Sequence, residues 1–465
     1  MVNVNDFKCA TDNETIELAI ASRKEDGIVL LPPRVSDVEP QRDYWLLDRA
    51  ILLPENITFV ISNTTVKLSD ACRDNFFRSA NCSLGIDECE PMKNIHIRGE
   101  GMATLLGADH PRAVGDGSKI LCNPCPYYKE DMIKYGYFIP EEKRQSGELD
   151  FWDFHAYSYG TDSGKEGESQ YGDWRGIGIL LANVSNFSIS NLRVVESHGW
   201  GISLEACSFG RVEKIEFDAC MHKEIDGLVN NMENQDGIDV RNGCHHIVIT
   251  DITGRTGDDV VALTAIANEN YHPNGSLCTT HFMHSDWSRR ERDIHDIVIR
   301  NVVAYTNLCW TVRLLPVGAH IWNVVIDGII DSAPDDLFHE GGVLLGEGDT
   351  AYGVNYPDGL KNITVSNVIS NGRHCVSVCG YLMDSALSNI ICRRPGGKAL
   401  RVDKENGLNN VLTCNLVETA EQNTQYRRAG ACSRRLHQRI TAAPVIDAAV
   451  NYWANWNWSI FYDVV

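Results

Sequence analysis

The chain has 465 residues, of which 43% are hydrophobic, 8% aromatic and 23% charged, a composition that gives a globular protein ample material for a core. Its formal net charge of −21 argues against nucleic acid as a partner, because phosphate binding needs a concentrated basic face. No apolar stretch has membrane-spanning length, and residues 1–6 lack the basic start of an export signal. We therefore expect no membrane partner and a soluble protein, either cytoplasmic or the mature form of a secreted one.

Residues 12–33 predict one helix followed by one strand. Asp12 or Asn13 can cap the helix, an apolar stripe begins at Ile16, and Gly27 ends it. Residues 28–33 are an apolar run closed by two prolines, which predicts a buried strand. Further on, residues 56–61 and 94–99 alternate apolar and polar side chains, as short strands do.

One short phrase then recurs down the chain: a polar residue, often Asn, followed by apolar residues at every second position and a polar turn. Its copies lie at least about 27 residues apart with a variable excess, as expected for a fixed coil that receives loops at one place. A β-sandwich would also give many short strands, but the hairpin doublets that it needs rarely fall between these copies. The pattern favours an all-β parallel solenoid, and we expect a single domain over residues 1–465. The copies begin at residues 186, 214, 246, 296, 323 and 362.

Three long insertions depart from the repeat, near residues 110–174, 265–292 and 331–358. They are rich in Gly, aromatic, His and charged residues, and loops of this kind on a rigid stack usually form the rims of a cleft. The aromatic stretch at residues 452–458 is expected to cover the open end of the last coil, because an uncovered coil exposes its core.

The 16 cysteines are scattered, so free buried thiols and disulfides both remain open. Cys122 and Cys125 form a CxxC that either a disulfide or a zinc site would explain, with Cys72, Cys82 and Cys89 upstream. A lone CxxC is weak evidence, and we expect neither a metal nor another cofactor.

Two acidic motifs are the strongest candidates for chemistry. Asp236 and the pair Asp258 and Asp259 each precede an alternating apolar run, so both motifs would head strands of successive coils. Stacked coils lie about 4.8 Å apart, and Gly257 permits a bend that turns both members of the pair outward. Carboxylates this close hold a proton on one member while the others stay charged, and glycoside hydrolysis needs this division between acid and base. The alternative is that these residues bind calcium or cap turns.

Further residues would surround the three carboxylates. In an aligned coil Trp200 lies beside Asp236, where it either stacks on a sugar ring or fills the coil. Arg313, between inward apolar residues, faces outward and either binds the substrate or pairs with an Asp. The expected substrate-binding set is Trp200, Asn234, Asp239, His281, His284, Trp310, Arg313, His339 and Glu340.

With these motifs in place, the chain resembles glycoside hydrolase family 28, the polygalacturonases, whose fold is a right-handed parallel β-helix. Asn234-Gln235-Asp236-Gly237 resembles the family's Asn-Thr-Asp-Gly, and Gly257-Asp258-Asp259 resembles its Gly-Asp-Asp. The resemblance implies an inverting hydrolase in which Asp258 is the general acid and Asp236 and Asp259 activate water.

The chain departs from this family at several positions. The family's Gly-His-Gly has no clear counterpart, and Leu315 stands where the Lys of its Arg-Ile-Lys is expected, although Arg313 is kept. Thr264 replaces a Lys that often follows the Asp-Asp strand. Because a chain of net charge −21 has lost two cations here, we expect a poly- or oligosaccharide substrate other than polygalacturonate, a neutral or singly charged sugar. The alternatives are a polysaccharide lyase or epimerase on the same fold, and a non-catalytic glycan-binding solenoid.

Overall fold

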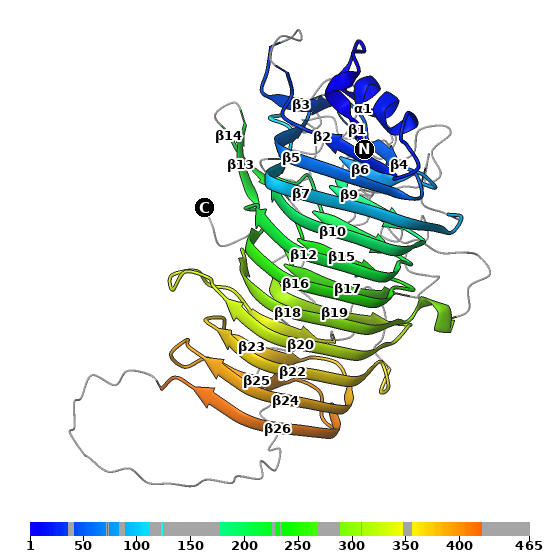
Figure 1. Cartoon of the computed structure of the whole chain (residues 1–465). Helices are drawn as coiled ribbons and strands as arrows, with labels where there is room; N and C mark the ends of the chain where they lie inside the picture. Colours follow the sequence, from blue (N-terminus) through cyan, green and yellow to red (C-terminus); the bar gives the residue numbers. More distant parts are fainter. Residues whose placement is uncertain are drawn as a thin grey trace, which may run out of the picture.

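The chain folds as a right-handed parallel β-helix, which confirms the predicted fold class. The computed structural model describes residues 1–35, 41–70, 72, 74–82, 89–110, 122–123, 176–225, 228–232, 235–266, 289–307, 309–346 and 356–420. Within these residues, two long parallel sheets stack coil upon coil, from α1 (Asp12–Ala21) at the N-terminal end to β26 (Leu408–Glu418) at the other (Figure 1).

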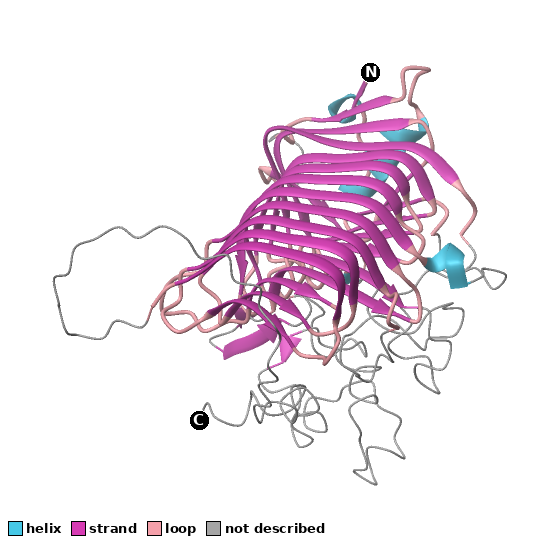
Figure 2. Cartoon of the chain, turned by 90° about the horizontal axis from the view of Figure 1, so that it is seen from below, coloured by secondary structure: helices cyan, strands magenta, loops and turns pink. Residues whose placement is uncertain are grey.

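The larger sheet has 13 strands, and Figure 2 shows its long members side by side as one curved surface. Its order is β1 (Val2–Asn3), β2 (Ile28–Leu31), β5 (Ile57–Leu68), β7 (Met92–Leu106), β10 (Val184–Val195), β12 (Ser208–Asp218), β16 (His245–Thr256), β18 (Ile294–Thr306), β20 (Ile321–Asp331), β22 (Leu360–Ser370), β24 (Leu382–Cys392) and β26, with β3 (Tyr44–Leu47) paired to β5.

The second sheet has 10 strands, and it lies across the core from the first. In chain order these are β4 (Ile51–Leu53), β6 (Phe77–Ser79), β9 (Ile179–Ala182), β11 (Ile202–Glu205), β15 (Ile238–Arg241), β17 (Val261–Ile266), β19 (Trp310–Val317), β21 (Gly341–Leu345), β23 (His374–Val378) and β25 (Lys398–Val402). A small antiparallel sheet joins β13 (His222–Ile225), β14 (Leu228–Met232) and β8 (Cys122–Asn123), and two short 3-10 helices are η1 (Val4–Asp6) and η4 (Arg289–Arg292).

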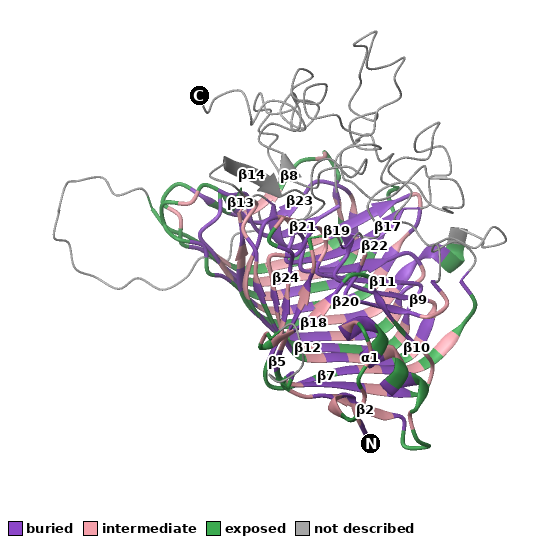
Figure 3. Ribbon diagram, turned by 90° about the horizontal axis from the view of Figure 1, so that it is seen from above, coloured by how far each residue is buried: buried purple, intermediate pink, exposed green. Residues whose placement is uncertain are grey.

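The core lies between the two long sheets and runs through the stack as one apolar cluster (Figure 3). Alternate residues of each strand point into it, so Ile247 and Ile249 of β16 lie in register with Ile297 and Ile299 of β18. Each coil therefore buries its apolar face against its neighbours. Among the described residues, no helix is long and apolar enough to cross a membrane.

The residue that heads the repeats at 186, 246, 296, 323 and 362 forms a bend in a strand of the larger sheet. The predicted copy at Lys214 is out of register with these, because Lys214 lies opposite Asn191 and Asp251, and Phe209 takes the equivalent place in β12. Asn323 and Asn362 have φ of 54° at this position, and Asn tolerates this left-handed conformation better than most side chains. Their amides also join successive coils, since Asn362 Nδ2 donates to Asn323 Oδ1 at 3.0 Å. We call this row of residues the bend row; its members include Asn186, Phe209, His246, Asp296, Asn323, Asn362, Asp384 and Asn410.

The N-terminal prediction needs two corrections. The helix cap is Thr11, whose hydroxyl accepts from Glu14 N while the Glu14 carboxylate accepts from Thr11 N, so neither Asp12 nor Asn13 caps it. The helix ends at Ala21, well before Gly27, which has φ of 66° and leads into β2.

The predicted insertions and cysteines are only partly described. The interval 331–358 is not wholly an insertion, because β21 lies inside it as a strand of the 10-stranded sheet. The side chains of Cys122 and Cys125 and the stretch 452–458 lie outside the described residues. Cys72, Cys82 and Cys89 are buried, and Cys82 Sγ lies 3.7 Å from Cys89 Sγ, too far for a disulfide bond.

Candidate active site

Both acidic motifs lie at the starts of adjacent strands of the 10-stranded sheet. β15 pairs in parallel with β17, and β17 pairs with β19, with Ile238, Val261 and Val312 in one register. Gly237 N donates to Asp259 O at 2.8 Å, which places Asp236 and Asp259 at equivalent positions of neighbouring coils. The predicted stacking of the two motifs is therefore present.

Glycine in each motif permits a close approach between coils. A Cβ on Gly237 would lie 2.4 Å from the carbonyl oxygen of Val260, and a Cβ on Gly257 would lie 2.9 Å from Gln235 Oε1. Gly257 N and Asp258 N both donate to the Gln235 carbonyl oxygen, at 3.1 and 3.2 Å, which ties the second motif to the first. Close packing, rather than a left-handed bend at Gly257, explains this residue, since its φ lies outside the left-handed region.

Asp258 and Asp259 present their carboxylates to the same space. One oxygen of each lies within 4.8 Å of the other and of Cys309 Sγ. Burial raises the pKa of the Cys309 thiol well above its ordinary value.

Asp259 is held from the next coil by two donors. Its Oδ1 accepts from Trp310 N at 2.9 Å, and its Oδ2 lies 3.2 Å from Arg313 Nη1. Burial at 1% exposure raises the pKa of Asp259 to about 7; the Arg313 charge opposes this rise and the Asp258 charge adds to it. This carboxyl therefore titrates near neutral pH.

Asp236 and Asp239 are also buried, at 6% and 2% exposure. Burial raises the pKa of Asp236 well above its ordinary value, and the negative charges of Asp258, Asp239 and Asp259 raise it further. Burial likewise raises the pKa of Asp239 well above its ordinary value, although the Arg241 charge lowers it. Close carboxyls share their protons as a set, so these groups titrate together and take up protons at higher pH than isolated carboxyls do.

A buried ion pair next to this group was not predicted from the sequence. Arg241 Nε lies 3.6 Å from Glu205 Oε1, with side-chain exposures of 5% and 0%, and Ser203 Oγ donates to the same Glu205 oxygen. The Arg241 guanidinium also lies 4.6 Å from the centre of the Trp200 ring. Trp200 is half-buried and packs on the outer side of the sheet, so one face of this predicted sugar platform is occupied by Arg241. Arg241 follows Asp239 by two residues in the same strand, so both side chains face outward, and this alternation is the sequence signal that points to Arg241.

The wall beyond Arg313 is apolar. Leu315 is the next outward residue of β19, lies in register with Thr264 of β17, and packs with Ile266 and Val317. These are the positions at which the sequence lacks the expected lysines. On this side of the sheet, the guanidinium groups of Arg241 and Arg313 already face carboxylates of the chain.

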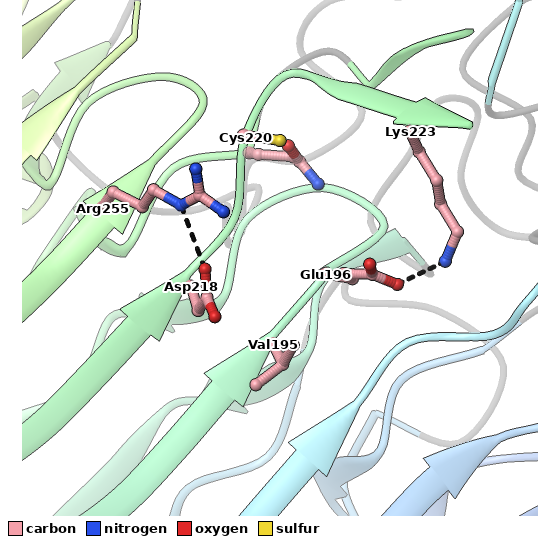
Figure 4. Close-up of a pocket in the computed structure, with 7 residues that line it drawn as sticks. Val195, Glu196, Asp218, Cys220, Lys223 and Arg255 are labelled. Atoms are coloured by element: carbon pink, nitrogen blue, oxygen red, sulfur yellow. Dashed lines mark hydrogen bonds and ion pairs between the residues drawn. The ribbon is translucent and has the colours of Figure 1, made fainter. Parts of the chain in front are cut away.

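A polar pocket of about 90 Å³ adjoins the first motif through Gln235. Figure 4 shows Lys223 paired with Glu196 and Arg255 paired with Asp218 around it, and the second pair has an Nε to Oδ1 distance of 3.0 Å.

The remaining predicted residues are placed as follows. His339 Nε2 lies 2.5 Å from Asp331 Oδ2, and both side chains are fully buried. This imidazole therefore contacts Asp331 and not the candidate catalytic carboxylates. Glu340 Oε2 lies 3.5 Å from His374 Nδ1, and Trp310 is 1% exposed against Cys309 and Leu344. Asn234, His281 and His284 lie outside the described residues.

Fold and site together describe a parallel β-helix with a carboxylate cluster on its outer wall. The sequence matches no family model and no curated protein. The structure is similar to a polygalacturonase from Erwinia carotovora ssp. carotovora (12% identity, 89% of this chain and 93% of that chain, TM-score 0.47) and to an exopolygalacturonase from Thermotoga maritima (16% identity, 89% and 91%, TM-score 0.44). It is also similar to a surface adhesin of Streptococcus pneumoniae (10% identity, 90% and 99%, TM-score 0.39). The functional argument rests on the side chains of this chain.

Proposed function

We propose that this chain is an inverting glycoside hydrolase that cleaves a poly- or oligosaccharide. The observation that carries the proposal is the stacking of Asp236 on Asp259 beside Asp258, with burial raising the pKa of Asp236 well above its ordinary value and that of Asp259 to about 7. Glycosidic cleavage needs one protonated carboxyl to protonate the leaving oxygen and one ionised carboxylate to activate water. A group of coupled carboxyls supplies both forms at the same pH.

The roles follow from accessibility. Asp258 is the least buried of the three, and its Oδ1 accepts from Asp259 N at 3.0 Å, so its other oxygen can meet the substrate as general acid. Asp259 and Asp236 lie deeper; Asp259, with a pKa of about 7, would deprotonate the attacking water in its ionised form, and Asp236 would orient that water. Arg313 positions Asp259 and keeps its pKa within reach of neutral pH.

The substrate that fits this wall best is a glycan of neutral or singly charged sugars. A repeated uronate would bring its carboxylates next to five acidic side chains of this wall: Glu205, Asp236, Asp239, Asp258 and Asp259. Two of these face a cation of the described wall, since Arg241 pairs with Glu205 and Arg313 pairs with Asp259. The apolar surface of Leu315, Ile266 and Val317 stands where a cation would have to meet a second uronate. Electrostatic repulsion therefore disfavours polygalacturonate.

The test is a panel of plant and host glycans incubated with the purified chain, with detection of new reducing ends. We expect turnover of at least one neutral glycan, and loss of at least about a hundredfold in Asp258→Asn and in Asp236→Asn. Asp251→Asn is a matched control, because Asp251 is exposed at a left-handed position that suits Asn equally.

Three outcomes would contradict the proposal. Retained turnover in both variants excludes the carboxylate mechanism. A product that absorbs in the ultraviolet, as an unsaturated sugar does, indicates a lyase instead. Binding of a glycan that persists in Asp258→Asn, without turnover by the unaltered chain, indicates an adhesin-like function.

A further inference from the structure

A cluster of three histidines and one aspartate lies on the larger sheet, whereas the candidate active site lies on the 10-stranded sheet. His245 and His295 occupy equivalent positions of β16 and β18, and His246 and Asp296 follow them in the bend row. The side chains of His246, Asp296 and His295 are 48%, 33% and 23% exposed, so the cluster is open to solvent. We call these four residues the imidazole cluster.

The potential ligand atoms of the imidazole cluster converge. One atom each of His246, His295 and Asp296 lies within 4.8 Å of the others. Asp296 Oδ2 is 2.7 Å from His295 Nδ1 and 3.8 Å from His246 Nδ1, and His245 Nδ1 is 2.9 Å from His246 Nδ1. A tetrahedral zinc site with bonds of about 2.0 to 2.2 Å separates its ligands by about 3.3 to 3.6 Å, which falls between these distances.

The bend row changes its chemistry at this point. Elsewhere Asn residues such as Asn323 and Asn362 adopt the left-handed bend and link their amides from coil to coil. Here His246 adopts it with φ of 56° and brings an imidazole to the row, beside Phe209 of the preceding coil. Asp296 uses Oδ1 to accept from Asn323, which directs Oδ2 to the imidazoles.

The imidazole rings are held in place by stacking. His295 lies between Trp322, with ring centres 4.2 Å apart and planes at 11°, and His245, at 5.0 Å and 4°. Rings fixed in this way lose little freedom on binding a ligand, so the geometry is preorganised.

We propose that the imidazole cluster binds a divalent transition-metal ion of the zinc type through His246, His295 and Asp296. Imidazole nitrogen suits Zn²⁺, Ni²⁺ and Cu²⁺, whereas Ca²⁺ and Mg²⁺ prefer oxygen ligands alone. Three protein ligands leave a fourth position for water or for His245. The proposal does not depend on the proposed hydrolase activity, because the cluster belongs to the other sheet.

The test is calorimetric titration of the tag-free full chain with Zn²⁺, together with Co²⁺ titration followed by visible absorption. We expect one ion per chain, the intense visible bands of tetrahedral Co²⁺, and no competition from Ca²⁺ or Mg²⁺. His246→Asn restores the prevailing residue of the bend row and should leave the fold intact while weakening binding by more than about 100-fold, since even an outer-shell partner contributes about 10- to 100-fold. His295→Gln should have a similar effect.

The matched control is His110→Asn. His110 is also exposed and lies 3.0 Å from the carboxylate of Asp70, but it is outside the imidazole cluster. It should keep the affinity of the unaltered chain. Absence of Zn²⁺ binding by the unaltered chain overturns the proposal, as does affinity that persists in a folded His246→Asn or His295→Gln.

Discussion

Asp236→Asn should stabilise the folded chain at neutral pH while abolishing turnover. Asp236 is 6% exposed, and burial together with the charges of Asp258, Asp239 and Asp259 raises its pKa well above the ordinary 3.8. The native state therefore binds a proton at pH values where the unfolded chain has lost it. The free energy of unfolding must then fall as pH rises from 3.8 towards the raised value, by up to about 1.4 kcal/mol per pH unit for one full proton.

Asparagine has nearly the same shape and does not titrate, so the variant escapes this loss. The stability of Asp236→Asn relative to the unaltered chain should be smallest near pH 4 and should grow as the pH rises towards the raised pKa of Asp236. Urea unfolding across this range, followed by both fluorescence and circular dichroism, measures the difference, and the exposed Asp251→Asn should give a flat profile. A difference that stays constant or shrinks with rising pH would refute the reasoning, because it would mean that Asp236 is ionised and stabilised in the native state.

Three further predictions concern neighbouring features. Arg313→Gln removes the cation that lowers the pKa of Asp259. If Asp259 is the base, kcat/KM rises with pH through about pH 7 in the unaltered chain, and this rise should move up by about 1 to 3 pH units in the variant. An unmoved pH profile would mean that Asp259 is not the base. Asn362→Ala should lower the free energy of unfolding by about 1 to 3 kcal/mol, because alanine is strained in the left-handed bend and cannot make the hydrogen bond to Asn323. Asn362→Gly should lose only that hydrogen bond. Equal losses for the two variants in urea unfolding would contradict the contribution of the left-handed bend. Gly237→Ala should lower the free energy of unfolding by about 1 to 3 kcal/mol in the same assay and should reduce turnover, because the added Cβ would meet the Val260 carbonyl oxygen. Unchanged stability and turnover would contradict the close approach between coils.

The solenoid could be predicted because the larger sheet shows its periodicity openly. Its strands alternate apolar and polar residues after a left-handed Asn, and this phrase survives variable loops. Inner strands of the 10-stranded sheet such as β21 are buried at every position, so they lack the alternation, and the sequence predicts an insertion where β21 lies. The helix cap was missed although the pattern of Thr11 and Glu14 is a capping box visible in the sequence.

The three carboxylates could be located from their motifs, but their electrostatics could not. Burial of Asp259 and its contact with Arg313 depend on which coil lies next to which, and the insertion near residues 265–292 separates the two residues in the chain. The pair of Glu205 and Arg241 depends on the same register. Side-chain parity predicts that these residues face outward, whereas only the stacked coils show that they meet.

The linear arrangement of the coils has a consequence for how the molecule opens. In its sheet β15 pairs only with β11 and β17, so a coil stays protected while its two neighbours stay folded. Fraying should begin at terminal strands such as β25 and β26 and advance inward one coil at a time, and amide hydrogen exchange should record this as a gradient along the chain. The strands that carry Asp236, Asp259 and Arg313 lie in the middle of the series. They should be among the last to exchange, so the acid/base group would remain assembled in partly unwound molecules.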